Sequence, residues 1–298
     1  MTAGRSGSLR WLLAVLFFAA ASVTAFGFDV GALFNIGNLA FAANRAATDT
    51  TFSGTQYPWG VTVYGREQIN DSLSVDTSFA MDPILRNVMD TTVTYSGNYF
   101  SVSAGPTLGL FNSTSQPLNP GISASVRVGL PGVVFLSYRG DSTLGSGLVS
   151  VGDYTQGRSD ISLGYYVPNA ICSANIRTSR YVEKTATGST VDDLTQYLFS
   201  TDIFQKNIPY RVLLSFGYQQ LSKTFNDGST TTVDALGSLI IETKVEVHLT
   251  DSLMFIGDLN SAVYTFGQQA LVGISNPGPN GYLFQLQTGL QLTLGQPN

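Results

Sequence analysis

The sequence predicts an all-β fold, a transmembrane antiparallel up-and-down β-barrel of fourteen strands, with twelve strands as the main alternative. Three observations support this prediction. Apolar and polar residues alternate through most of the chain, which is the period of a β-strand. Charged residues make up only 12% of the 298 residues, well below the usual share in soluble proteins. The polar positions of the alternating segments carry mainly Ser, Thr, Gly, Asn and Gln, which suits an enclosed lumen better than bulk water.

The first segment, residues 1–25, is predicted to be a signal peptide. Arg5 and Arg10 form a positively charged start, and an apolar run of about eleven residues follows from Trp11 to Ala21. This run is too short to cross a bilayer as a helix. Small residues precede the cleavage expected after Ala25. Residues 26–298 are then predicted to form a single barrel domain.

Alternating segments follow one another along the rest of the chain. Between Ile122 and Leu130, for example, apolar residues alternate with Ser123, Ser125, Arg127 and Gly129. The predicted strands start near Phe26, Tyr57, Leu73, Leu85, Tyr99, Gly121, Val133, Arg158, Ala170, Asp193, Tyr210, Thr232, Leu253 and Gly281.

Short and long connections are predicted to alternate between these strands, as in transmembrane barrels. The expected short connections are 70–72, 97–98, 131–132, 168–169, 205–209 and 250–252. The expected long ones are 39–56, 112–120, 140–157, 184–191, 223–231 and 267–280. The brief connection at Met81–Ile84 is the exception, so the third and fourth strands form the least clear pair.

Two local features give more specific expectations. The pattern Asp-Ser between apolar residues occurs at Asp71-Ser72 and again at Asp251-Ser252, and such side chains can bond their own backbone to fix a tight turn. Pro106 lies inside an alternating run, where it lacks the N–H group that a ladder bond needs. We therefore expect a bulge or an early strand end at Pro106.

The apolar face of the segments indicates contact with lipid. It combines Leu, Val and Ile with aromatic rings near strand ends, where the interfacial girdles of membrane barrels lie. Because hydrocarbon offers no hydrogen-bond partners, a sheet in it must close on itself. The aromatic residues in question are Tyr57, Trp59, Tyr95, Phe100, Tyr138, Tyr165, Tyr210, Tyr218 and Tyr282.

The last segment carries a resemblance to a known family. The run Gln287–Leu294 resembles the C-terminal assembly signal of bacterial outer-membrane β-barrels, with Gln287, Gly289, Leu292 and Leu294 at the pattern positions. It departs from the pattern in that Leu294 is not aromatic and four residues follow it. The chain is also similar in size to monomeric fourteen-stranded porins. The resemblance implies an outer-membrane location, periplasmic termini, extracellular long loops, and contact with outer-membrane lipid and the barrel-assembly machinery.

Charged residues on the polar face are predicted to line the lumen. Opposite charges are about equally represented there, so ion selectivity should be weak unless the charges segregate by height. An alternative is that these ions pair across the lumen and only solvate it. The candidate pore-lining residues are Asp76, Arg127, Arg177, Arg211, Glu242, Lys244 and Glu246.

The predicted function is a porin-like channel for passive diffusion of small hydrophilic solutes. One alternative is a transporter of small hydrophobic compounds, although the first strand begins almost directly after Ala25 and leaves no room for the N-terminal hatch of the fatty-acid transporters. Another is a surface-exposed adhesin or structural barrel without an open pore, whose loop 140–157 could bind a partner. These alternatives stay open at this point.

Other classes of function have little support in the sequence. His248 is the only His and stands near Asp251 and Ser252, but Asp71-Ser72 repeats the same element without a His, so a turn explains it better than a hydrolase site. One His and one Cys cannot form a thiolate or imidazole metal site, and we expect no cofactor. Cys172 is expected to be a small lipid-facing residue. A net charge of −5 and a pI of about 4.7 argue against nucleic acid as a partner.

Overall fold

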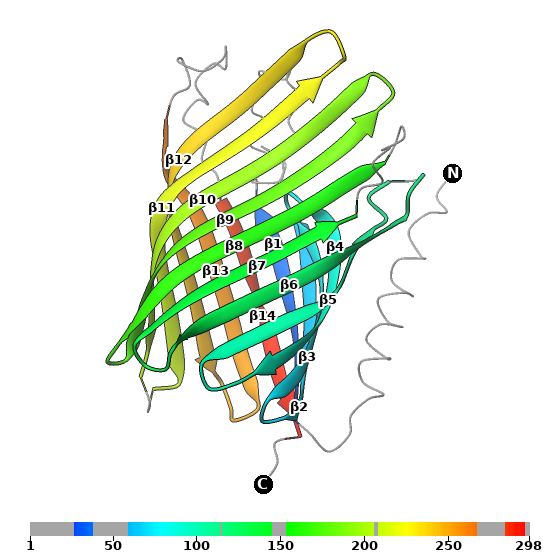
Figure 1. The fold of residues 1–298 in the computed structure, drawn as a ribbon. Helices are drawn as coiled ribbons and strands as arrows, with labels where there is room; N and C mark the ends of the chain where they lie inside the picture. Colours follow the sequence, from blue (N-terminus) through cyan, green and yellow to red (C-terminus); the bar gives the residue numbers. More distant parts are fainter. Residues whose placement is uncertain are drawn as a thin grey trace.

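The computed structural model describes residues 27–37, 59–113, 115–144, 153–205, 208–266 and 284–295. These residues form fourteen β-strands that close into one antiparallel barrel (Figure 1). The predicted fold class and the strand number of fourteen are therefore confirmed, and the alternative of twelve strands is wrong. The predicted signal peptide, residues 1–25, lies outside the described residues.

The strands follow the alternating segments of the sequence closely. They are β1 (Phe28–Gly37), β2 (Trp59–Asn70), β3 (Leu73–Asp82), β4 (Arg86–Ser96), β5 (Phe100–Leu110), β6 (Leu118–Leu130), β7 (Val134–Thr143), β8 (Tyr154–Val167), β9 (Ala170–Thr185), β10 (Gly188–Phe204), β11 (Tyr210–Asn226), β12 (Thr231–His248), β13 (Leu253–Phe266) and β14 (Phe284–Leu294).

Each strand pairs with its neighbours in the chain, and β1 also pairs with β14 in the register Phe28↔Leu294. This last ladder closes the sheet. Closure leaves the backbone groups of each strand with a partner on both sides over the paired stretches, which is what a sheet in hydrocarbon requires. The uncertain pair β3 and β4 is regular, with a continuous register from Leu73↔Tyr95 to Asp82↔Arg86.

The two ends of the barrel differ. The end drawn at the bottom of Figure 1, called the lower end here, carries the connections β2–β3, β4–β5, β6–β7, β8–β9, β10–β11 and β12–β13, together with the start of β1 and the end of β14. The other end is called the upper end. Strands β9 to β12 have 16 to 18 residues, and their hairpins rise above the rest of the barrel at the upper end (Figure 1).

These tall hairpins correct two predictions. Residues 184–191 were expected to form a long loop, but β9 and β10 continue through this stretch in the register Thr190↔Glu183 and Gly188↔Thr185. The connection 223–231 is also shorter than expected, because β11 extends to Asn226. Both stretches are polar on both faces, so they show little of the alternation by which the other strands were identified.

The short turns are fixed by a different residue from the one expected. In the β2–β3 turn the Asn70 Oδ1 atom accepts a bond from the Ser72 backbone N–H at 2.9 Å. In the β12–β13 turn the Thr250 Oγ1 atom accepts from the backbone N–H groups of Ser252 and Leu253 at 3.3 and 3.0 Å. The residue before each Asp therefore supplies the side-chain acceptor, because it stands two residues before the N–H group that needs a partner.

The expected bulge or strand end at Pro106 is wrong. Strand β5 runs through Pro106 and pairs with β6 in the register Pro106↔Ile122. The ladder to β4 keeps one register from Val93↔Ala104 to Asp90↔Thr107 but has no pairs at Gly105 and Pro106. The missing N–H group is thus accommodated by a local gap in one ladder rather than by a shift of register.

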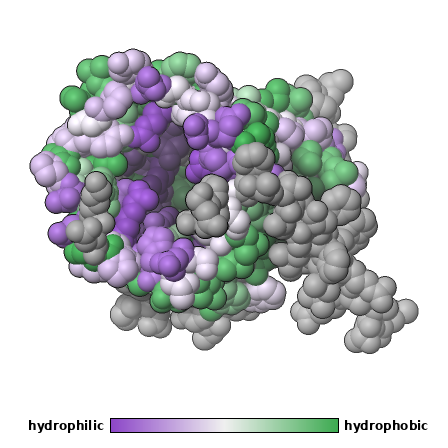
Figure 2. Space-filling model, turned by 90° about the horizontal axis from the view of Figure 1, so that it is seen from below, coloured by the Kyte–Doolittle hydropathy of each residue, from purple (hydrophilic) through white to green (hydrophobic). Residues whose placement is uncertain are grey.

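The barrel is apolar outside and polar inside. Large apolar side chains such as Phe216 and Leu163 are exposed on the outer face, whereas Asn119, Ser123 and Ser238 on the inner face are buried. Figure 2 shows the same contrast from the lower end, where hydrophilic residues line a hollow and hydrophobic residues surround it. This is the reverse of a soluble protein and fits a barrel whose outer face contacts lipid. In the described part of the chain no helix has the length and apolarity to cross a membrane.

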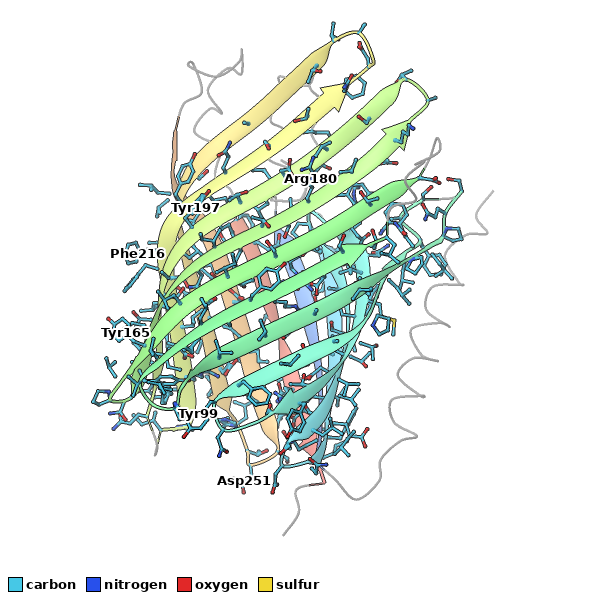
Figure 3. All side chains as sticks on the ribbon, viewed as in Figure 1. Tyr99, Tyr165, Arg180, Tyr197, Phe216 and Asp251 are labelled. Carbon is cyan, nitrogen blue, oxygen red and sulfur yellow. The ribbon has the colours of Figure 1, made fainter. Side chains whose placement is uncertain are left out.

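Aromatic side chains project from the outer face near the strand ends. Tyr99 and Tyr165 lie toward the lower end in Figure 3, whereas Tyr197 lies higher, near the middle of the long strand β10. All three rings are exposed. This arrangement matches the interfacial girdles expected from the sequence, although Tyr57 and Tyr282 lie outside the described residues. Cys172 is also on the outer face, with its Sγ atom 3.9 Å from the Thr201 hydroxyl.

The closing seam is reinforced from the inside. The Tyr64 side chain of β2 crosses over β1 at Gly31, and its hydroxyl donates a hydrogen bond to Gln291 Oε1 of β14 at 2.8 Å. A Cβ atom at Gly31 would stand 2.2 Å from the Tyr64 ring, so only glycine leaves room for this crossing. One side chain thus ties together the first, second and last strands.

Candidate functional site: the barrel lumen

The seven predicted lumen residues lie on inner strand faces, and six of them are ion-paired. Arg177 Nη1 of β9 is 2.9 Å from Glu242 Oε2 of β12, and Glu246 is 2.7 Å from Lys244 and 3.5 Å from Arg211. Asp76 pairs with Arg66 at 3.5 Å on the opposite side of the barrel. The structure therefore brings together Arg177 with Glu242, and Glu246 with its two cations, and it leaves Asp76 apart.

Arg127 is held differently from the other six. Its Nη2 atom donates a hydrogen bond to the Tyr166 hydroxyl at 2.7 Å, and its guanidinium lies 3.8 Å from the centre of the Phe135 ring. In the described residues no carboxylate lies within ion-pair distance of Arg127. The residue is exposed near the lower end of β6. It is thus a fixed cation without a neutralising neighbour among these residues.

A four-membered ion cluster joins side chains of β4, β7 and β8, and β5 and β6 lie between β4 and β7 in the sheet. Asp90 Oδ2 is 2.9 Å from Arg158 and 3.4 Å from Arg139, and Asp141 pairs with the same two arginines. Ser123 donates a hydrogen bond to Asp141, and Thr107 donates one to Asp90. Both carboxylates are buried and fully engaged, which satisfies the requirement that a buried charge be paired.

The β3–β4 turn enters the lumen instead of standing above the rim. Ile84 and Leu85 are almost completely buried, and Ile84 packs with Leu194 of β10 and Leu221 of β11. The Asp82 carboxylate accepts hydrogen bonds from the backbone N–H groups of Ile84 and Leu85 at 2.8 and 2.7 Å, which holds the turn rigid. The turn therefore spans from one wall of the barrel to the inner face of β10 and β11 and narrows the lumen there.

A polar cavity remains on the other side of the lumen. It has a volume of about 440 Å³ and is lined by β1 to β7 and β14. Hydroxyl groups and charged side chains make up most of its wall. The lining residues that project into it include Tyr64, Arg66, Asp76, Asp90, Arg139 and Gln291. This is enough room for several water molecules or a small hydrophilic solute.

Sequence reasoning missed several lumen residues. Asp141 and Lys223 were placed in loops and Asp192 at a loop end, yet they continue the inner faces of β7, β11 and β10. Asp192 pairs with Lys223 at 3.7 Å and with Arg86 at 3.7 Å. Extending the strict alternation past the expected strand ends would have found all three, because each stands an even number of residues from a recognised inward residue.

The predicted assembly signal forms β14. Leu292 and Leu294 pair with Val30 and Phe28 on the apolar side, and Gly289 stands opposite Leu33. A Cβ atom at Gly289 would be 1.9 Å from the Ala32 carbonyl oxygen, so the strands approach each other too closely for another residue. Recognition of this strand by the assembly machinery stays a prediction.

The described residues offer little for catalysis or metal binding. His248 ends β12 at the lower end and is exposed, and the hydroxyl-bonded turn of Thr250 follows it. In the described ranges no three or more His, Cys, Asp or Glu side chains gather as a metal site would require. The absence of enzymatic activity, of a cofactor and of a nucleic-acid partner stays a prediction from the sequence.

Comparisons with known proteins found matches among solved structures only. No protein-family model and no curated protein matches the chain. Among solved structures the barrel is similar to OmpT, an outer membrane protein of Vibrio cholerae, with a TM-score of 0.42 and 9% identity over 90% of this chain and 99% of that chain. It is also similar to a porin, with a TM-score of 0.41 and 10% identity over 90% of this chain and 99% of that chain. A third neighbour is Salmonella typhi OmpF in complex with daunomycin, with a TM-score of 0.40 and 10% identity over 90% of this chain and 97% of that chain.

The barrel architecture itself is given by the closed fourteen-stranded sheet of this chain. A likeness of this degree says nothing about what this chain binds or transports.

Proposed function

We propose that the chain is an outer-membrane channel for the passive diffusion of small hydrophilic solutes, with its termini in the periplasm and its longer loops outside the cell. The observation that carries this proposal is the polar cavity of about 440 Å³ inside a closed barrel whose outer face is apolar. The hydrophilic hollow at the lower end supports it (Figure 2). Charged and hydroxyl side chains can replace the hydration shell of a passing solute.

The two alternatives have less support from the described residues. A carrier of hydrophobic compounds needs accessible apolar surface in the lumen, but Ile84, Leu194 and Leu221 bury one another there. A silent structural barrel or adhesin needs no polar cavity at all. The polar cavity therefore favours a hydrophilic path, with outer-membrane lipid around it and small solutes as its partners.

Reconstitution tests the proposal directly. The purified protein is inserted into a planar bilayer, and the current is recorded in potassium chloride while the voltage is varied. We expect stable steps of ohmic conductance, and liposome swelling in small sugars at a rate that falls with the size of the sugar. A folded barrel that carries no current and admits no sugar would contradict the channel and leave the structural or adhesive role.

A further inference from the structure

We propose that the lumen selects small anions, inorganic or organic, over cations of similar size. This inference rests on the proposed channel function and adds the charge class of the solute to it. Acidic residues outnumber basic ones on the inner faces of the described strands, so a simple count predicts no preference for anions. The structure shows, however, that the two kinds of charge differ in how exposed they are. The cations are accessible from the lumen, and most of their partner carboxylates are buried.

The separation is visible within individual ion pairs. The Arg139 side chain is 46% exposed, whereas its partners Asp90 and Asp141 are 7% and 5% exposed. The Arg211 side chain is 51% exposed, against 11% for Asp202, with which it forms a double hydrogen bond. In each pair a solute in the lumen therefore meets the guanidinium and not the carboxylate.

The cation is also the more exposed partner in the ion pair on β12. In two other ion pairs the difference in exposure is smaller. Lys244 is 38% exposed and its partner Glu246 is 18% exposed. In the pair of Arg66 with Asp76 the difference is smaller, because the Arg66 side chain is 53% exposed and the Asp76 side chain is 40% exposed. Arg177 and Asp160 are equally exposed at 33% and 35%, although the second partner of Arg177, Glu242, is at 10%.

Side-chain length explains this pattern. Most acids of the inner face are aspartates, whose carboxylates stay close to the wall and accept bonds from neighbouring hydroxyls such as Ser123 and Thr107. Arginine is long enough to pair with such a carboxylate through one edge and to present the rest of its planar group to the lumen. The guanidinium also stays charged at any working pH. The accessible positive charge is therefore permanent.

The exposed arginines lie mainly toward the lower end of the lumen. On the inner faces of the described strands the exposed charged residues are all arginines, and among their ion-paired acids Asp76 is the most accessible. Three of them lie near the lower ends of β2, β6 and β11, and one lies further up on β7. They are Arg66, Arg127, Arg211 and Arg139.

An ion in the lumen responds most strongly to the charge it can approach. Coulomb energy falls inversely with distance, so an anion about 4 Å from a guanidinium feels a carboxylate about 4 Å behind it roughly half as strongly. The net effect is attraction of anions and repulsion of cations at each exposed arginine. Arginine and lysine rings serve anion pores elsewhere in membrane proteins on the same principle.

Reversal potentials test this inference. The reconstituted wild-type channel is placed between solutions of potassium chloride that differ tenfold in concentration, and the potential at zero current gives the permeability ratio of chloride to potassium. We expect a ratio above one. We also expect the ratio to fall by about threefold in the double variant Arg66→Gln with Arg127→Gln, because two accessible cations are lost.

These two positions and their control are chosen to preserve folding. Arg127 has no carboxylate partner in the described residues, and the partner of Arg66 is itself exposed, so neither substitution leaves a buried charge unpaired. The matched control is Arg180→Gln, which removes an arginine that is 63% exposed and points outward from β9 (Figure 3). We expect the control to keep the wild-type ratio.

The outcomes separate the two proposals. A silent wild-type barrel would overturn the channel function and the anion preference with it. A conducting wild-type barrel that favours potassium, or neither ion, would overturn the anion preference alone. An equal change in the Arg180→Gln control would assign the effect to total charge and would also overturn the role of the exposed lumen arginines.

Discussion

The guanidinium of Arg86 lies 4.9 Å from the centre of the Tyr181 ring, although the two residues belong to β4 and β9 on different walls of the barrel. Tyr181 in turn stacks on Tyr154 of β8, with ring centres 5.7 Å apart. Arg86 has a backbone φ of 67°, a conformation that residues other than glycine seldom adopt. Arg86 therefore combines an unfavourable backbone conformation with a contact to the far wall, and backbone strain of this kind persists only where the surroundings enforce it.

The substitution Arg86→Ala tests whether this turn limits the channel. It removes the contact with Tyr181 and the ion pair with Asp192, while Lys223 still neutralises Asp192 at 3.7 Å. We expect a larger single-channel conductance with more rapid fluctuations, because the turn loses its anchor on the far wall. Arg180→Ala, on the outer face, is the control and should conduct like the wild type. An unchanged conductance in Arg86→Ala would show that the turn does not narrow the path.

The ion cluster of β4, β7 and β8 predicts a large stability effect. Arg158→Gln leaves the buried carboxylates of Asp90 and Asp141 with Arg139 alone. Breaking a buried ion pair costs about 3–5 kcal/mol, so we expect a loss of that order in the free energy of unfolding. Urea titration of the protein in lipid vesicles, followed by tryptophan fluorescence, measures it.

Arg66→Gln serves as the comparison for the cluster, because its ion pair with Asp76 is exposed. Exposed ion pairs contribute about 0–1 kcal/mol, so this variant should unfold near the wild-type urea concentration. Equal losses in the two variants would mean that burial of the carboxylates does not set the cost.

The seam between β1, β2 and β14 predicts a steric effect. Gly31→Val places a side chain where the Tyr64 ring crosses the strand, at a point where even a Cβ atom stands 2.2 Å from that ring. Overpacking of this kind costs about 1–3 kcal/mol, and we expect the barrel to unfold at a lower temperature in a gel-shift assay. The double variant Gly31→Val with Tyr64→Ala should recover part of the loss. A double variant no more stable than Gly31→Val would argue against the crossing as its cause.

The β11–β12 turn predicts a pH dependence. Asp227 accepts bonds from the backbone N–H groups of Ser229 and Thr230 at 2.8 and 2.6 Å and from both of their hydroxyls. These bonds favour the charged form and hold the pKa of Asp227 well below its usual range. Because the folded pKa is lowered, the stabilisation is complete above the unfolded pKa of about 3.9 and is lost as the pH falls toward the folded value.

Hydrogen exchange of this turn measures the effect. At pH 6 we expect Asp227→Asn to exchange the amides of Ser229 and Thr230 faster than the wild type, after correction for intrinsic rates. Below about pH 4 the difference between the two proteins should shrink, since the carboxylate begins to lose its advantage. A difference that is constant over this range would mean that the charge of Asp227 does not order the turn.

Much of the barrel could be predicted from the sequence. Alternation placed all fourteen strands, and within most strands it also separated inner from outer residues, so that Arg177, Glu242 and Glu246 were predicted on the inner face. This works because side chains on a strand point alternately to two faces, and lipid and water select opposite residue types. The same signal fades where both faces meet water, which is why the upper parts of β9 and β10 were mistaken for a loop.

The arrangement of the lumen, in contrast, was decided by the tertiary structure. Alternation shows that Asp90, Arg139 and Arg158 face inward, but only closure of the sheet determines that they form one cluster. Alternation also does not show that Ile84 reaches Leu194 across the lumen. It does not show either that the carboxylates are buried while the arginines are exposed. Pairing partners depend on register, strand number and side-chain length together, whereas the face of a residue depends only on its place in its own strand.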